Sequence, residues 1–250
     1  MYLFQILGGK RSNPAEWPFV VQINNGIGLC TATIIGKQWI LSAAHCNEDN
    51  KNITIIIGDK DYPSDRFIIH ENYLSTQITN INDIILIKLK QPIKYTRDIT
   101  NVCLVRNVTA VNGDIAAVVG YGERFENVKN VDATEKEHLK LQDLNFKDSS
   151  ILRETPLIIR NMDYCKALEA FAINRICAGG EMQGTTRGDS GGPLLVVRNN
   201  RWIQYGITSY GSYKAVAKNV NKISDLGIYT TVSAYCDWIE NNTSGEIKCK

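Results

Sequence analysis

The chain has 250 residues, of which 44% are hydrophobic, so it can form one large domain or two small ones with a buried core. Its net charge of only +2 gives no indication of a nucleic-acid surface or an acidic tail. No apolar run reaches the roughly 18 residues that a membrane-spanning helix needs. From the charge we therefore expect no nucleic acid as a partner, and from the apolar runs no membrane.

The first residues, 1–5, open an apolar segment that lacks the basic region and full apolar length of a secretion signal. We interpret them as a remnant of a propeptide or leader. Short apolar segments rich in Val, Ile, Thr and Tyr then alternate with polar turns, which is typical of an all-β sandwich or barrel. These segments cover 19–23, 33–35, 53–57, 84–89, 115–119, 202–208 and 228–232.

Between these segments, a boundary between two halves is predicted near 106–112. The charged stretch 123–137 is predicted to be a long exposed loop, and a helix is possible around 163–171. A clearer helix is predicted late in the chain, with Ser233 as its N-cap. Its apolar face would consist of Val232, Tyr235, Cys236 and Ile239.

The sharpest chemical signal is the sequence Gly188-Asp189-Ser190-Gly191-Gly192-Pro193. A serine is a poor nucleophile unless a base takes its proton. It also needs backbone N–H groups directed at the developing oxyanion, and a preceding glycine lets the backbone approach closely. A Gly-rich turn before a strand is the ordinary explanation of Gly-Ser-Gly, but not of six residues in this order.

Two further motifs supply the partners that such a serine requires. His45 lies among small residues in Leu41-Ser42-Ala43-Ala44-His45-Cys46, whereas no motif surrounds His70 or His138. Asp83 opens an apolar strand, where a buried carboxylate is costly unless it is hydrogen-bonded. Such a carboxylate fixes the tautomer of a catalytic histidine.

Together these three segments resemble the trypsin/chymotrypsin family of serine proteases, in the family's order of His, Asp and Ser. The resemblance continues over nearly the whole chain. It includes Ile6-Leu7-Gly8-Gly9, Gly120-Tyr121-Gly122, Ser209-Tyr210-Gly211, Gly227-Ile228-Tyr229-Thr230 and Asp237-Trp238-Ile239.

The resemblance implies two six-stranded antiparallel β-barrels with a C-terminal helix and the active site in the cleft between the barrels. The N-terminal barrel would cover 6–110, the C-terminal barrel 111–231 and the helix and tail 232–250, with 6–240 as one peptidase domain. His45, Asp83 and Ser190 would be the catalytic triad of a serine endopeptidase. Gly188 and Ser190 would form the oxyanion hole.

Activation is also implied by the resemblance. After cleavage before Ile6, its new α-amino group would pair with Asp189, although Gln5 is not the Arg or Lys common before the cleaved bond. No cofactor and no metal are expected, since the cysteines lack paired short spacing. Protein or peptide substrates and protein protease inhibitors are the expected partners, and a monomer is expected.

The seven cysteines, considered with the sequons and these motifs, favour a secreted protein. Glycosylation is predicted at Asn52, Asn107 and the overlapping Asn241/Asn242 pair, with Asn242 as the preferred site of the pair. The resemblance implies disulfides Cys30–Cys46 and Cys165–Cys177. It also suggests Cys236 or Cys249 as the partner of Cys103. Because the number of cysteines is odd, one thiol should remain outside the disulfides of the chain.

The sequence departs from the family in the region of the primary pocket. Thr186 replaces a family cysteine whose partner after Gly211 is also absent, which predicts a less constrained pocket wall. The segment between Ser209 and Gly227 is longer than usual and carries three lysines. They are Lys214, Lys218 and Lys222.

The resemblance places the pocket floor at Gly184, beside Thr185, where trypsin-like members have an aspartate. Arg187 would lie at the rim and Gly211 and Gly227 at the walls, while Ser209, Tyr210 and Gly211 would contact substrate backbone. Without a charge on the floor, we expect apolar or aromatic side chains first, as in chymotrypsin-like enzymes. Small, elastase-like side chains come second and acidic ones third.

Two alternatives compete with an active endopeptidase. A non-catalytic protease homologue that binds or regulates other proteins usually lacks a triad residue, and none is missing here. An α/β-hydrolase would match Gly-x-Ser-x-Gly at Ser190 but needs a histidine after the serine, and no histidine follows His138.

Overall fold

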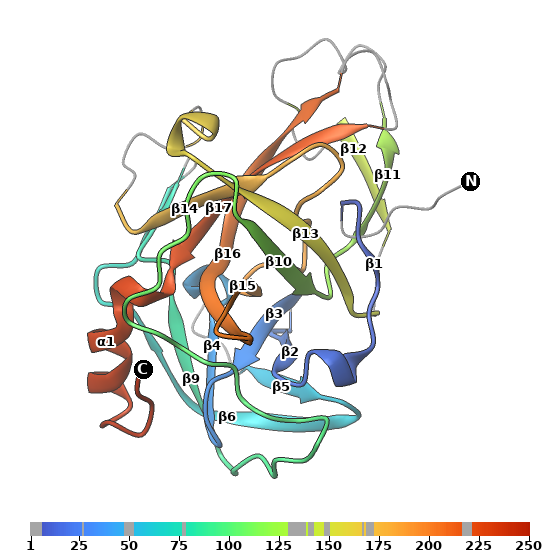
Figure 1. The fold of residues 1–250 in the computed structure, drawn as a ribbon. Coiled ribbons are helices and arrows are strands. Elements are labelled where there is room, and N and C mark those ends of the chain that lie inside the picture. The colour runs from blue at the N-terminus through green and yellow to red at the C-terminus, as the bar shows by residue number, and fades with distance from the viewer. Residues whose placement is uncertain are drawn as a thin grey trace.

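The computed structural model contains two β-barrels, one above the other in Figure 1, with a short helix against the lower barrel. It describes residues 7–26, 28–47, 53–76, 79–129, 139, 143–147, 151–166, 168, 173–216 and 222–250. The predicted all-β fold of two six-stranded antiparallel barrels and a C-terminal helix is confirmed.

The first barrel is a closed antiparallel sheet in the order β2-β3-β4-β9-β6-β5. Its strands are β2 (Val20–Asn24), β3 (Leu29–Ile34), β4 (Trp39–Ser42), β5 (Thr54–Ile57), β6 (Lys60–Ile69) and β9 (Ile85–Leu89). Their isoleucines and leucines fill the interior, and Ile23, Ile40 and Ile55 are fully buried. Closure leaves no sheet edge, so the segments that follow β4 and precede β9 start from a rigid frame.

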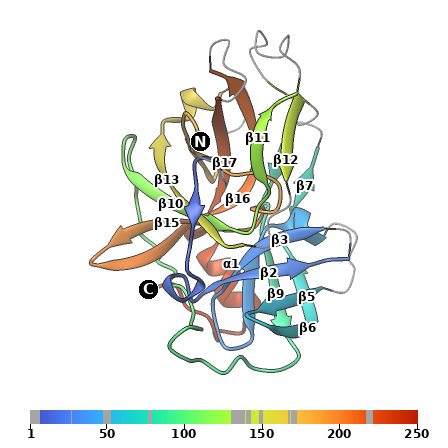
Figure 2. The same cartoon turned by 90° about the vertical axis from the view of Figure 1, so that its right-hand side faces the viewer.

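The second barrel has six strands that close through the pairing of β13 with β14. They are β10 (Ile115–Gly120), β13 (Arg153–Arg160), β14 (Arg175–Gly179), β15 (Pro193–Arg198), β16 (Arg201–Ala215) and β17 (Ile223–Thr231). Burial in β13 alternates along the strand, as expected when one face points to the core. The short strand β1 (Lys10–Arg11) pairs with β13, so the start of the chain joins the second barrel (Figure 2).

The C-terminal helix α1 (Cys236–Asn242) follows a 3-10 turn at Val232–Tyr235. The predicted apolar face is buried, with Val232 and Ile239 fully enclosed in the core of the first barrel. The predicted cap is wrong: Tyr235, not Ser233, occupies the N-cap position, because the 3-10 turn delays the start of the helix.

One loop prediction was partly wrong. The stretch 123–137 contains β11 (Arg124–Val128), which pairs with β12 (Leu144–Lys147) and buries Phe125 and Val128. Two apolar side chains among charged neighbours suffice for a strand, because only one face of this hairpin is covered. Residues 130–138 lie outside the described residues. The possible helix at 163–171 begins as a 3-10 turn at Met162–Tyr164, and of its later residues 167 and 169–171 are not described.

Three disulfides connect residues that are close in the sequence. They are Cys30–Cys46, Cys165–Cys177 and Cys236–Cys249. The first two are those that the family resemblance implies. The expected bridge from Cys103 to Cys236 or Cys249 is wrong, because those two cysteines pair with each other and Cys103 is a free thiol.

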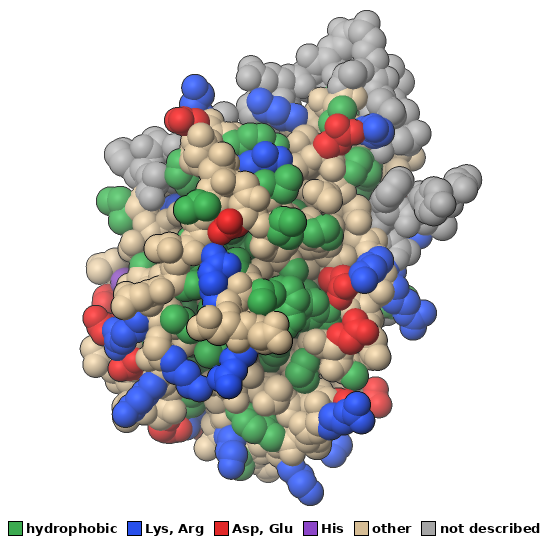
Figure 3. Space-filling model, viewed as in Figure 1, with side chains coloured by type: hydrophobic (Ala, Val, Ile, Leu, Met, Phe, Trp, Pro, Cys, Tyr) green, Lys and Arg blue, Asp and Glu red, His purple; other side chains and the backbone are tan. Residues whose placement is uncertain are grey.

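The face of the molecule in Figure 3 carries side chains of both charges, in agreement with the small net charge. Ion pairs such as Lys88–Glu246 and Arg106–Asp237 lie at the surface and link the C-terminal segment to the rest of the chain. Among the described residues, no helix has the length and apolar character needed to cross a membrane.

Candidate active site

Asp83 lies two residues before β9 and is completely buried. Its Oδ1 accepts a hydrogen bond from the backbone N–H of His45 at 3.0 Å, and its Oδ2 faces the Nδ1 of the His45 ring at 2.8 Å. The hydroxyl of Ser209 donates to the same Oδ2. Burial alone would raise the pKa of Asp83, but the charge of His45 and these hydrogen bonds outweigh burial and hold the pKa below its ordinary value.

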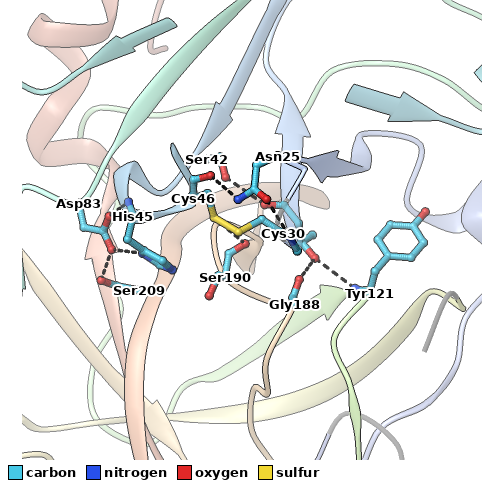
Figure 4. Close-up of a disulfide and its surroundings, with 12 residues drawn as sticks. Asn25, Cys30, Ser42, His45, Cys46, Asp83, Tyr121, Gly188, Ser190 and Ser209 are labelled. Atoms are coloured by element: carbon cyan, nitrogen blue, oxygen red, sulfur yellow. Dashed lines mark hydrogen bonds and ion pairs between the residues drawn. A yellow bond between two sulfur atoms is a disulfide. The ribbon is translucent and has the colours of Figure 1, made fainter. Parts of the chain in front are cut away.

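His45 lies in a 3-10 helix, Ala44–Asn47, directly after β4. The adjacent disulfide Cys30–Cys46 ties this turn to β3. In Figure 4 the ring of His45 lies between Asp83 on one side and Ser190 on the other. The hydrogen bond to Asp83 fixes the proton on Nδ1 and leaves Nε2 as the base.

Ser190 lies in the turn before β15 of the second barrel, and the first barrel holds this turn in place. The N–H of Thr31 donates to the carbonyl of Ser190 at 2.9 Å, and the Thr31 hydroxyl donates to the carbonyl of Gly188 at 2.8 Å. Neither the N–H of Gly188 nor that of Ser190 has an acceptor among the described residues. The turn therefore presents two N–H donors that are unused.

Gly188 has a φ of +91°, a conformation that side chains disfavour. A Cβ at this position would also lie 3.1 Å from the Cα of Gly122. A glycine is thus required for the turn that directs these N–H groups. The geometry agrees with the role that the sequence predicts for Gly188 and Ser190.

Asp189, beside Ser190, points away from that serine into the second barrel. Its carboxylate accepts hydrogen bonds from the N–H of Gly122 at 2.8 Å and from the N–H of Thr186 at 2.8 Å. Burial raises the pKa of Asp189 to about 6, despite these hydrogen bonds. Ile6, its predicted partner, lies outside the described residues, but the next residue, Leu7, is fully buried and its carbonyl accepts from the N–H of Gly184.

Thr186, which replaces the family's cysteine, is held by polar contacts. Its hydroxyl donates to the carbonyl of Glu123 at 2.5 Å and lies 3.2 Å from the carboxylate of Asp189. These bonds provide part of the constraint that a disulfide would give to this wall.

The predicted pocket residues come together around the β16–β17 hairpin. Gly211 pairs with Gly227, and both lie near the segment that contains Gly184 and Thr185. Arg187, which was predicted to lie at the rim, is exposed. Two other predicted substrate contacts belong to β16: Ser209 binds Asp83, and the Tyr210 hydroxyl lies 2.9 Å from that of Thr79.

The prediction that no charged group lies at the pocket floor is wrong. The side chain of Asp225, on β17, occupies the space beside Gly184, and its Oδ2 accepts from the N–H of Thr185 at 3.2 Å. The sequence contained a signal for this residue. In a strand, alternate side chains share a face, so Asp225 lies on the same face as Gly227 and Tyr229.

Of the three lysines predicted near the pocket, one is paired elsewhere and one lies outside the described residues. Lys222 forms an exposed ion pair with Glu181 at 2.8 Å, so its charge is directed away from the pocket. Lys218 falls outside the described residues. Lys222 therefore gives no support to a pocket that prefers acidic substrate side chains.

The predicted glycosylation sites differ in accessibility. Asn107 is exposed, and Asn52 lies outside the described residues. Asn242 is half-buried and its amide donates to the carbonyl of Trp238, whereas Asn241 is exposed. Glycosylation stays a prediction, with Asn241 the more accessible of the pair. Within the described ranges, no three His, Cys, Asp or Glu side chains are arranged to hold a metal ion.

Comparison with known proteins identifies the family. The family model described as Trypsin matches residues 6–239. A curated relative, Transmembrane protease serine 11G of Mus musculus, is 30% identical over 259 aligned residues, which cover 96% of this chain and 56% of the relative. The chain therefore spans little more than half of that relative's length. With a family match over nearly its whole length and two barrels around a His-Asp-Ser cluster, the chain belongs to the trypsin family.

Proposed function

We propose that this protein is a serine endopeptidase that hydrolyses peptide bonds through an acyl-enzyme intermediate, with His45, Asp83 and Ser190 as its triad. The observation that carries the proposal is the buried Asp83 carboxylate, bonded to both the ring and the backbone of His45. A buried carboxylate in this arrangement orients a histidine and stabilises its protonated form. The two unused N–H groups at Gly188 and Ser190 give independent support.

The mechanism follows from these positions, with the roles known for this family. His45 Nε2 takes the proton of the Ser190 hydroxyl as its Oγ attacks the carbonyl carbon of the substrate. The N–H groups of Gly188 and Ser190 stabilise the negative oxygen of the tetrahedral intermediate. His45 then gives its proton to the leaving amine, which leaves an ester on Ser190. Water repeats the sequence, releases the acid and restores the hydroxyl.

The expected substrates are proteins or peptides whose backbone pairs with the segment Ser209-Tyr210-Gly211, as an added strand pairs with a sheet edge. Protein protease inhibitors would occupy the same cleft. We further propose that residues 6–240 act as one monomeric peptidase domain outside the cell, where its disulfides persist.

A fluorophosphonate probe tests the proposal, because it reacts only with a serine that its histidine activates. We expect one probe molecule per processed chain, attached to Ser190, and none on Ser190→Ala. The matched control is Ser42→Ala, since this buried serine lies close by but its hydroxyl donates to the carbonyl of Thr31. A processed, folded chain that stays unlabelled would establish the alternative, a non-catalytic homologue.

The same proposal includes activation by cleavage before Ile6. Asp189 has hydrogen-bond donors but no cation among the described residues, and its raised pKa reflects that lack. The buried Leu7 brings the preceding residue to this side of the second barrel. A new α-amino group at Ile6 would supply the missing charge, and pairing would order the turn of Ser190.

Before cleavage, Asp189 should make stability depend on pH. Its pKa is about 6 in the folded chain and 3.8 unfolded, so between these values the folded state holds more protons. The free energy of unfolding should therefore fall by about 2 kcal/mol as the pH rises from about 4 to 6. Urea denaturation of chains that retain 1–5 measures this fall, and in Asp189→Asn the fall between these pH values should be smaller by this amount.

In the cleaved chain the α-amino charge should lower the pKa of Asp189. The contribution of Asp189 to the fall in the free energy of unfolding should then disappear, and activity should appear. Asp189→Asn should then remain inactive after cleavage, since an amide cannot pair with the ammonium group. Full activity in a chain that retains residues 1–5 would contradict this activation step.

The specificity expected from the sequence, chymotrypsin-like or elastase-like, depended on an uncharged pocket floor at Gly184. Asp225 occupies this place, so the floor carries a carboxyl group.

A further inference from the structure

The carboxyl group of Asp225 lies where the floor of the primary pocket meets its wall. A Cβ built on Gly184 would be 2.2 Å from Asp225 Oδ2, so the aspartate fills the space that any side chain at 184 would need. Its other oxygen, Oδ1, lies 3.4 Å from a Cβ built on Gly211, on the opposite wall. The carboxyl group therefore reaches from one wall to the other, and Gly184 is the residue that makes room for it.

Burial increases from the mouth of this region to its floor. Arg187 and Gly211 are exposed and Tyr210 is half-buried, whereas Asp225 is only 1% exposed and Tyr229 is fully buried. The Tyr229 hydroxyl is buried next to the side chain of Thr185. It points at Gly227, because a Cβ on that glycine would lie 2.9 Å from it. Two buried polar groups thus face the same space from β17.

No positive charge from the described part of the chain neutralises this carboxyl group. Among the described residues, no Lys, Arg or His forms an ion pair with Asp225. The ionisable groups that influence it or respond to it are Asp189, Tyr213 and Tyr229. None of these side chains supplies a cation. A buried carboxylate is costly until a cation pairs with it, and a substrate side chain can bring that cation.

On these observations, and given the proposed protease function, we propose that Asp225 determines the specificity of the primary pocket. It replaces the charge that Gly184 lacks and selects substrates with Lys or Arg before the cleaved bond. The cationic end of such a side chain would bind the Asp225 carboxylate between Gly184 and Gly211. The Tyr229 hydroxyl would accept a second hydrogen bond from it.

The test compares kcat/KM on peptides that differ only in the residue before the cut: Arg, Lys, Phe, Leu or Glu. The wild-type protein should cleave the Arg and Lys peptides best. Asp225→Asn keeps the shape of the side chain and removes its charge. It should lower kcat/KM for these two peptides by on the order of 100-fold or more, while the Phe peptide changes by less than about 5-fold.

Glu181→Gln is the matched control, because Glu181 lies next to β17 but its carboxylate is exposed and paired with Lys222. This variant should leave the Arg-to-Phe ratio unchanged. Benzamidine, a flat amidinium, should inhibit the wild-type protein and Glu181→Gln competitively, and inhibit Asp225→Asn far more weakly. Preference for Phe or Leu in the wild-type protein, or an unchanged ratio in Asp225→Asn, would overturn the proposal.

The pH dependence provides a further readout. Burial and the nearby Asp189 raise the pKa of Asp225 well above its ordinary value. Since only the ionised form attracts a cation, the Arg-to-Phe ratio should rise with pH in the wild-type protein and stay flat in Asp225→Asn. Fluorophosphonate labelling of Ser190 separates the two proposals. A labelled protein without this ratio refutes only the role of Asp225, and an unlabelled one refutes the protease function itself.

Discussion

Replacement of Ser190 by alanine is expected to lower kcat by about 10⁶, and replacement of His45 by alanine should have a similar effect. Ser190 supplies the bond-forming oxygen, and His45 supplies the base that makes this oxygen nucleophilic. Neither residue works without the other. The double variant should therefore be no slower than either single variant within a factor of about ten.

The measurement is single-turnover and steady-state cleavage of one peptide by the processed forms of all four proteins. The remaining rate should stay above that of the uncatalysed reaction, because the N–H groups of Gly188 and Ser190 still bind the oxyanion. Ser42→Ala serves as a control for the loss of a buried hydroxyl near the site. A loss of less than about 100-fold in Ser190→Ala would exclude this serine as the nucleophile.

Asp83→Asn is expected to lower kcat by about 10⁴, a magnitude that comes from enzymes of this family. The local geometry gives the reason. Both carboxylate oxygens accept hydrogen bonds, Oδ1 from the backbone N–H of His45 and Oδ2 from the ring and from Ser209. An amide NH₂ must replace one of these acceptors, and the backbone N–H cannot change its role.

The asparagine should consequently turn its NH₂ toward the ring, which forces the proton of His45 onto Nε2. This tautomer cannot take the proton of Ser190. Ser209→Ala is the matched comparison, since it removes one hydrogen bond to Asp83 and leaves the ring contact. Its loss should be near 10-fold. Equal losses in the two variants would mean that Asp83 acts through packing and not through the tautomer.

The short β-branched segments of the sequence predicted an all-β fold, and the family resemblance specified two barrels and the residues His45, Asp83 and Ser190 that the structure brings together. Barrel strands are visible as short β-branched segments because the interior of each barrel is apolar. The residues around His45 and Ser190 are recognisable because the chemistry permits few alternatives there. The disulfide Cys165–Cys177 could be predicted because its two cysteines have the spacing that the family shows.

Tertiary structure was needed wherever a residue's role depends on a segment far away in the chain. Cys103 looked like a partner for Cys236 or Cys249, but the short tail after α1 brings those two cysteines together instead. Gly184 predicted an uncharged pocket because its sequence neighbours are neutral. Only the packing of β17 against this segment reveals that Asp225 fills the space. A glycine specifies the room it leaves, and the fold decides which side chain occupies that room.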